Sequence, residues 1–85
     1  MARFTNSNTD ETVDFDVQVT LGSESAVVEG AACHDLIEVL AEWGKPGGFG
    51  DAEFAMEFEG TTLRGCVVER VDGSRRLTID FMERE

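Results

Sequence analysis

The consecutive residues Cys33, His34 and Asp35 have the side-chain types of a thiol nucleophile, a base and an orienting carboxylate. The surrounding periodicity predicts a helix, in which neighbouring side chains point about 100° apart and cannot hydrogen-bond in series. His34 is the only histidine, and we expect it on the helix surface within reach of Glu38 one turn later. A core Cys33 and a solvated His34 are therefore favoured over catalysis.

Two groups of carboxylates could act in pairs or bind a metal ion. Asp14 and Asp16 share one parity of a predicted strand, and Glu53, Glu57 and Glu59 share one parity of another. Catalysis by paired carboxylates needs one buried acid with a raised pKa, whereas these residues alternate with apolar residues that must point into the core. One histidine, two distant cysteines and the absence of a calcium-loop spacing argue against a metal site. We therefore expect no metal, no cofactor and no enzymatic activity.

The segment 44–50 is rich in glycine, as phosphate-binding loops are. Such loops place their glycines before a helix, whereas this segment follows a predicted helix and precedes a strand. The simpler interpretation is a flexible connection. The alternative is that Phe49, flanked by glycines at a loop tip, inserts into a pocket of a partner protein.

Acidic residues recur on the side of the predicted helix that faces away from Leu36 and Leu40. They are Asp35, Glu38 and Glu42, with Glu29 just before the helix. Charges one helical turn apart lie about 5–6 Å from each other, which is comparable in order of magnitude to the phosphate spacing along a nucleic-acid strand. Such a row is usually only the solvated face of an amphipathic helix. The net charge favours a binding role, because it exceeds what solubility needs.

That net charge is −11 on 85 residues, from 18 acidic and 7 basic residues. It excludes nucleic acid and anionic membranes as direct ligands. Hydrophobic residues make up 41% of the chain, enough for one folded core. The longest apolar runs have three residues, so no membrane span is expected.

The start of the chain lacks the apolar stretch of a secretory signal, which predicts a cytoplasmic location. Cys33 and Cys66 lie far apart and match no metal or redox spacing, so free thiols in a reducing compartment are expected. A disulfide between them stays open, because only geometry decides it.

The elements follow from periodicity. The polar residues 1–11 predict a flexible tail, and the alternation over 12–21 predicts one strand with Val13, Phe15, Val17, Val19 and Leu21 buried. A turn at 22–25 and a short strand over 26–29 would complete a hairpin. Apolar steps of three and four over 31–43 predict an amphipathic helix, which Gly44 ends in a left-handed cap before Pro46.

Three more strands are predicted over 53–59, 63–71 and 77–81, the second in a central position and the third after a turn at Asp72–Gly73. The expected fold is α+β: a small antiparallel sheet of four or five strands in β-β-α-β-β-β order, with one amphipathic helix packed on one face. Residues 12–85 would form a single domain after the tail.

In size, acidity and compact α+β pattern the chain is similar to phage-encoded anti-CRISPR and anti-restriction proteins, some of which mimic nucleic acids. The resemblance implies an inhibitor that binds a basic, nucleic-acid-binding surface of a partner protein and blocks it. The expected partner-binding residues are Asp35, Glu38, Glu42, Glu29, Asp14, Asp16 and Phe49.

Three alternatives remain open. The order of elements from Asp35 to Phe81 also resembles some bacterial immunity proteins, which neutralise a toxin. Lys45 is the only lysine, and an acid-rich, lysine-poor surface is also typical of salt-adapted proteins, in which charge carries no binding role. An exposed strand edge could support a homodimer.

Overall fold

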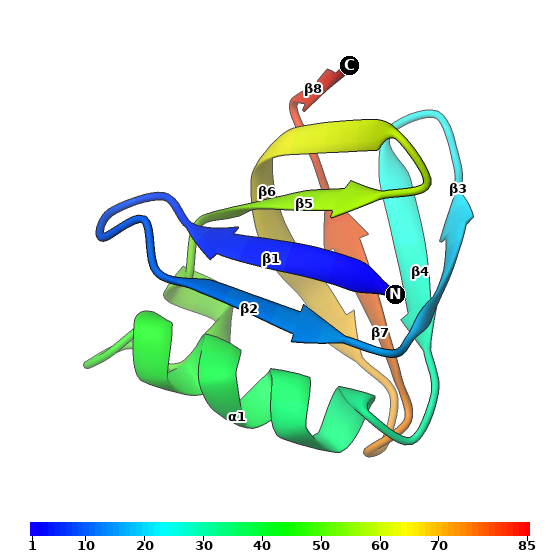
Figure 1. Ribbon diagram of the computed structural model, residues 1–85. Helices are drawn as coiled ribbons and strands as arrows, with labels where there is room; N and C mark the ends of the chain where they lie inside the picture. The colour runs from blue at the N-terminus through cyan, green and yellow to red at the C-terminus, as the bar shows by residue number, and fades with distance from the viewer.

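Eight antiparallel strands and one α-helix make up the computed structural model, which describes residues 1–85 (Figure 1). The strands are β1 (Ala2–Asn6), β2 (Thr12–Phe15), β3 (Gln18–Leu21), β4 (Ser25–Glu29), β5 (Phe54–Phe58), β6 (Thr61–Val71), β7 (Arg76–Asp80) and β8 (Glu83–Arg84). The helix α1 (Cys33–Trp43) and a short 3-10 helix η1 (Phe49–Asp51) lie between β4 and β5. The α+β class and the helix packed on the sheet are confirmed, but the sheet has more strands than the four or five expected.

The strand order is β2-β1-β5-β6-β7-β4-β3, and β8 pairs with β6. The long strand β6 is shared: its first half pairs with β5 and β8, and its second half pairs with β7. Gly65 lies at the bend with a φ of +65°, where β6 carries one residue more than β5. The bend turns β1, β2 and β5 across the direction of β3, β4 and β7 (Figure 1). The central position predicted for 63–71 is confirmed.

The core fills the inside of this curved sheet. Apolar residues of alternate strand positions meet the buried side of α1, and sixteen of them form one cluster. The helix contributes Cys33, Leu36 and Leu40 to it and runs along one end of the curved sheet (Figure 1). Neither helix of the structure has the length and apolarity needed to cross a membrane.

The N-terminal residues are not the flexible tail that their polarity predicted. Strand β1 lies between β2 and β5, and the side chains of Ala2, Phe4 and Asn6 are buried. Asn6 also begins the turn into β2: its side-chain oxygen accepts the Asn8 N–H at 2.8 Å. Two apolar residues are enough to hold this strand because Phe4 packs against two other phenylalanines, Phe15 and Phe54.

The single strand predicted over 12–21 is also wrong. The chain turns at Asp16–Val17, where the Val17 N–H donates to the Phe15 oxygen at 3.1 Å, and the two halves lie at opposite ends of the strand order. The prediction that the apolar side chains of this stretch face the core was nevertheless correct, since all five are buried or partly buried. The alternation of buried and exposed side chains continues through the turn because β2 and β3 line the same core.

The end of α1 differs from the predicted left-handed cap. Gly44 has a φ of −87°, and its N–H donates to the Leu40 oxygen at 3.0 Å. A glycine is required there for space: an added Cβ would collide with the backbone oxygen of Gly48. The loop after the helix therefore folds back over Gly44.

Candidate functional site

The front of α1 carries an exposed cluster of His34, Asp35 and Glu38. The side-chain ligand atoms of the three residues lie within 4.8 Å of one another, and His34 Nδ1 is 3.4 Å from Asp35 Oδ1. The cluster forms because Leu36 and Leu40 turn into the core and leave these neighbours on the solvent side. Sequence spacing predicted the acidic pair and the histidine beside it. All three side chains are exposed, as acidic groups on protein surfaces commonly are without a metal ion.

The other two members of the predicted acidic row already have basic partners. Glu42 Oε2 lies 2.8 Å from Lys45 Nζ, and Glu29 Oε2 accepts Arg76 Nη2 at 3.0 Å. Exposed pairs of this kind contribute about 0–1 kcal/mol to stability. They do reduce the free negative charge at these two positions, so the strongest unneutralised part of the row is Asp35 and Glu38.

Asp14 and Asp16, expected on one strand face, are separated by the turn at Asp16–Val17. Asp14 lies on the outer face of β2 and accepts a 3.0 Å hydrogen bond from Arg3 Nε. This bond lowers the pKa of the Asp14 carboxyl below its ordinary value. Asp16 faces a different part of the surface and forms no ion pair.

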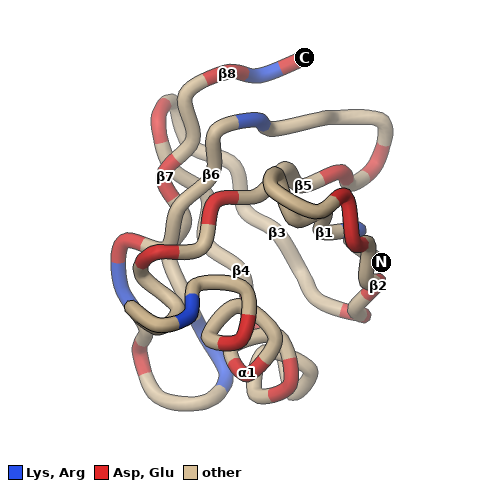
Figure 2. The backbone as a smooth tube through the Cα atoms, turned by 90° about the vertical axis from the view of Figure 1, so that its left-hand side faces the viewer, with Lys and Arg blue, Asp and Glu red and all other residues tan.

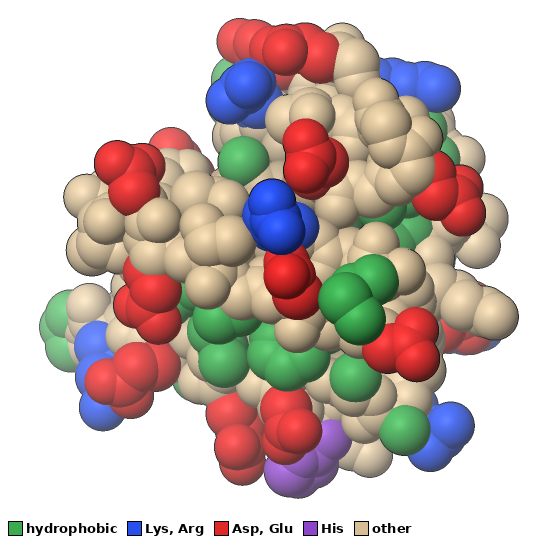
Figure 3. Space-filling model, viewed as in Figure 1, with side chains coloured by type: hydrophobic (Ala, Val, Ile, Leu, Met, Phe, Trp, Pro, Cys, Tyr) green, Lys and Arg blue, Asp and Glu red, His purple; other side chains and the backbone are tan.

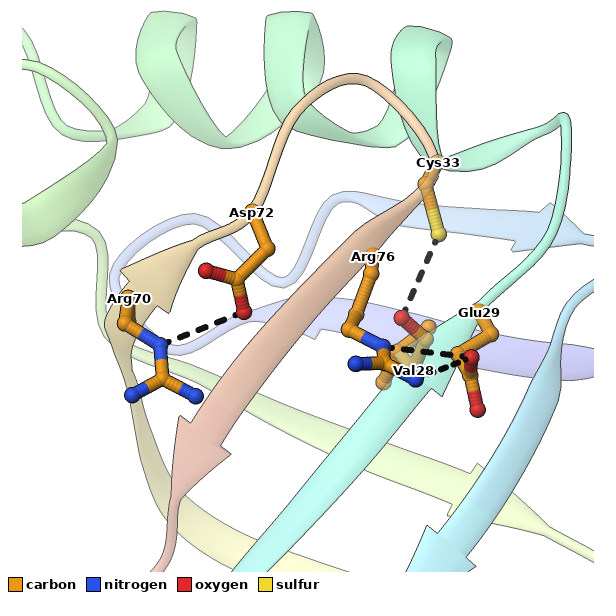
Figure 4. Close-up of polar contacts among 6 residues, drawn as sticks. All are labelled: Val28, Glu29, Cys33, Arg70, Asp72 and Arg76. Atoms are coloured by element: carbon orange, nitrogen blue, oxygen red, sulfur yellow. Dashed lines mark hydrogen bonds and ion pairs between the residues drawn. The ribbon is translucent and has the colours of Figure 1, made fainter.

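Asp16 and Glu29 instead meet at a polar hollow of about 660 Å³ between β3, β4 and the β6–β7 turn. Its other charged lining residues are Asp72, Arg75 and Arg76. Figure 4 shows the two ion pairs of this region, Arg76 with Glu29 and Arg70 with Asp72, which lie outside the sheet near the start of α1. Acidic and basic groups nearly balance here, so the hollow lacks the net charge that would favour a phosphate or a metal ion.

Basic residues are few and mostly committed to ion pairs. Four arginines and Lys45 each pair with one carboxylate, and these pairs neutralise five of the eighteen acidic residues. The acidic residues outside these pairs are spread over α1, the turns and the strands β5, β6, β7 and β8, and Figure 2 shows how widely acidic residues are distributed along the chain. Figure 3 shows acidic side chains scattered over one face of the molecule, some of them next to the histidine below the helix.

Phe49 does not lie at a free loop tip. It begins η1, which packs against α1 and β6, and its side chain is 38% exposed. The loop is therefore more ordered than the flexible connection predicted for it. More than half of the phenylalanine ring is covered within the molecule, and the remainder is open to solvent.

The two thiols are buried and free. Cys33 donates to the Val28 oxygen and Cys66 to the Leu63 oxygen, both at 3.5 Å (Figure 4 shows the first). Burial raises the pKa of both thiols, that of Cys66 to about 12. Since Cys33 is fully buried and His34 is exposed, the two side chains point apart, as the helical spacing predicted.

One surface feature was missed by the sequence reasoning. The chain end at Met1 and the β5–β6 turn at Phe58–Glu59 approach the outer edge of β3 and form a groove with it. Only the alternation of Val17 and Val19 with polar residues hinted at a strand here; the approach of Phe58 depends on pairing between distant segments. Comparison with known protein families, with curated proteins and with solved structures finds no match, so the chain's own chemistry carries the functional argument.

Proposed function

We propose that this protein is a small, acidic, non-enzymatic inhibitor that binds the basic, nucleic-acid-binding surface of a partner protein in the cytoplasm and blocks it. The face of α1 around Asp35 and Glu38 makes the first contact. The remaining residues proposed for binding are Asp14, Asp16, Glu29, Glu42 and Phe49, which lie outside this cluster; Asp14, Glu29 and Glu42 already form ion pairs. This is the mode of action of anti-CRISPR and anti-restriction proteins that mimic nucleic acids.

The observation that carries the proposal is the pair Asp35 and Glu38. Their carboxylates lie within 4.8 Å of a common histidine, are exposed and have no lysine or arginine partner. Like charges held this close repel each other, and a basic partner relieves that repulsion. The cluster therefore favours a cationic protein surface over any neutral or anionic ligand.

The overall charge adds to this local effect. At −11, the molecule attracts a basic protein at long range, which raises the association rate and makes it fall steeply with ionic strength. A partner that normally holds a phosphate backbone has such a surface. Competition with nucleic acid follows, because both ligands need the same basic residues.

The test compares the native protein with the double variant Asp35→Lys/Glu38→Lys. Each is immobilised and used to capture proteins from cells, and the proteins retained only by the native form are identified. The matched control is Glu24→Lys/Glu83→Lys, which changes the net charge equally but lies in turns and strands away from α1 (Figure 1). The binding of each captured protein to labelled nucleic acid is then measured by fluorescence anisotropy with the inhibitor added.

We expect the control to retain the partner and displace nucleic acid, while the α1 variant does neither. A partner retained equally by both variants would contradict the role of Asp35 and Glu38. A captured protein that binds its nucleic acid unchanged in the presence of the inhibitor would contradict blocking. If the chain captures nothing and folds only at high salt, its charge is an adaptation to salt and the proposal is wrong.

A further inference from the structure

The outer edge of β3 carries backbone groups that no strand of the molecule pairs. The Gly22 N–H donates to the Ser25 oxygen at 2.7 Å. In an antiparallel pair every second residue bonds to the neighbouring strand, so Thr20 and Gln18 also bond to β4. The N–H and C=O groups of Val19 and Leu21 therefore point away from β4. Strand β3 is last in the strand order, and these groups lie along its open edge (Figure 1).

This edge forms one wall of a groove of about 430 Å³. The opposite wall comes from the start of the chain and from the β5–β6 turn. Apolar lining is supplied by Met1, Val17, Val19 and Phe58, and the polar lining by Asp16, Gln18, Thr20 and Glu59. The groove thus combines unpaired backbone groups with an apolar surface continuous with the core.

The charged side chains of the groove, Asp16 and Glu59, are both acidic. No lysine or arginine lines it, and neither Asp16 nor Glu59 forms an ion pair. A second copy of this chain would bring two acidic edges together, which repulsion disfavours. A cationic segment meets no such penalty.

We propose that this groove binds an extended segment of the partner protein, in which apolar side chains alternate with lysine or arginine. The segment pairs its backbone with Val19 and Leu21 as an added strand. Its apolar side chains pack on Val19 and Phe58, and its basic side chains face Asp16 and Glu59. This inference rests on the proposed function for the basic character of the partner, but it assigns the contact to a surface separate from α1.

The probe is a fluorescein-labelled synthetic peptide of about eight residues in which lysine alternates with valine. Its affinity is measured by fluorescence anisotropy, and a peptide alternating glutamate with valine serves as the charge control. We expect the lysine peptide alone to bind. Binding should also protect the amides of Val19 and Leu21 from hydrogen exchange.

The decisive variant is Val19→Pro. Proline removes the outward N–H without removing a bond to β4, and the charge is unchanged. We expect about a tenfold loss of affinity, which is the effect of one backbone hydrogen bond. The matched control is Thr12→Pro. The Asn6 N–H donates to the Glu11 oxygen, so by alternation the N–H of Thr12 points away from β1. Proline at this position therefore also removes a free donor from the edge of a strand. Far-ultraviolet circular dichroism verifies the fold of both.

A charge variant keeps the inference testable if Val19→Pro does not fold. Asp16→Asn/Glu59→Gln should weaken peptide binding several-fold and reduce its salt dependence, whereas Asp10→Asn/Glu11→Gln on the β1–β2 turn should not.

Equal peptide affinity in Val19→Pro and Thr12→Pro, both folded, would overturn the inference, as would binding without protection of Val19 and Leu21. Concentration-dependent dimers that protect the same amides would assign the edge to a second copy instead. The outcome is separable from the proposed function: the peptide measurement needs no natural partner, and capture through Asp35 and Glu38 can succeed while the groove binds nothing.

Discussion

The rings of Phe4 and Phe54 pack with their centroids 6.0 Å apart and their planes inclined at 52°. Phe4 comes from the first strand and Phe54 from the first strand after the helix, and both are fully buried. This contact ties the N-terminal segment to the middle of the sheet. It makes residues that read as a polar tail essential to the core.

Replacing Phe4 with alanine should therefore destabilise the protein by about 3–5 kcal/mol, through lost burial and a cavity. Urea unfolding followed by tryptophan fluorescence measures the change. Phe49→Ala is the matched control, and its effect should be below about 1 kcal/mol because the ring of Phe49 is partly exposed. Similar losses in the two variants would show that β1 is not part of the folded sheet.

The Cys66 thiol predicts a loss of stability at alkaline pH. Its pKa is about 12 in the folded protein and 9.0 ordinarily, so the unfolded chain loses this proton first. The stabilising effect is complete below about pH 9 and disappears as the pH rises toward 12. Urea midpoints measured from about pH 8 to about pH 11 should fall more in the native protein than in Cys66→Ala. Parallel pH profiles would contradict this.

The same burial predicts that both thiols are unreactive in the native state. A thiol-specific chromogenic reagent should label Cys33 and Cys66 only as fast as the protein opens, and both at once in denaturant. Rapid labelling of either thiol under native conditions would show that it is accessible.

Substitutions at Glu59 should change the stability of the fold and the affinity for the peptide independently. It has a φ of +47° in the two-residue turn between Phe58 and Thr61, where asparagine is preferred over glutamate. Glu59→Asn should stabilise the fold by about 0.5–1 kcal/mol while weakening the lysine–valine peptide. Glu59→Gln should weaken the peptide equally without the gain in stability. A variant that gains stability and retains peptide affinity would remove Glu59 from the groove's binding residues.

A substitution at Gly65 tests how tightly the bend of β6 is packed. An added Cβ would lie 3.0 Å from Met82 Cβ, in addition to the positive φ. Gly65→Ala should destabilise by about 2–3 kcal/mol, and Gly73→Ala, with a similar φ and open space around it, by about 1 kcal/mol. Thermal unfolding of the two variants gives the difference, and equal effects would show that Met82 moves aside freely.

Periodicity predicted the helix and the three later strands over 53–59, 63–71 and 77–81, because these depend on neighbouring residues. It failed where pairing is remote. Residues 2–6 have too few apolar side chains to indicate a strand, and their partner around Met56 lies far along the chain. The alternation over 12–21 continues through Val17, so the turn left no signal in the pattern.

The candidate site shows the same division. The proximity of Asp35 and Glu38 follows from helical spacing and was predictable. The pairing of Asp14 with Arg3 depends on the β1–β2 register, and the groove beside β3 depends on where Phe58 ends after a long crossover. Neither relation is encoded within a short window of sequence.

The order of the strands also determines when this chain can fold during synthesis. Phe4 pairs with Met56, and Val28 pairs with Leu77, so neither end of the sheet has its neighbour until late in the chain. The early hairpins β1–β2 and β3–β4 have only two strands each, and an isolated two-stranded hairpin is at best marginally stable in water. The core can therefore form only after β7 has been synthesised and has left the ribosome.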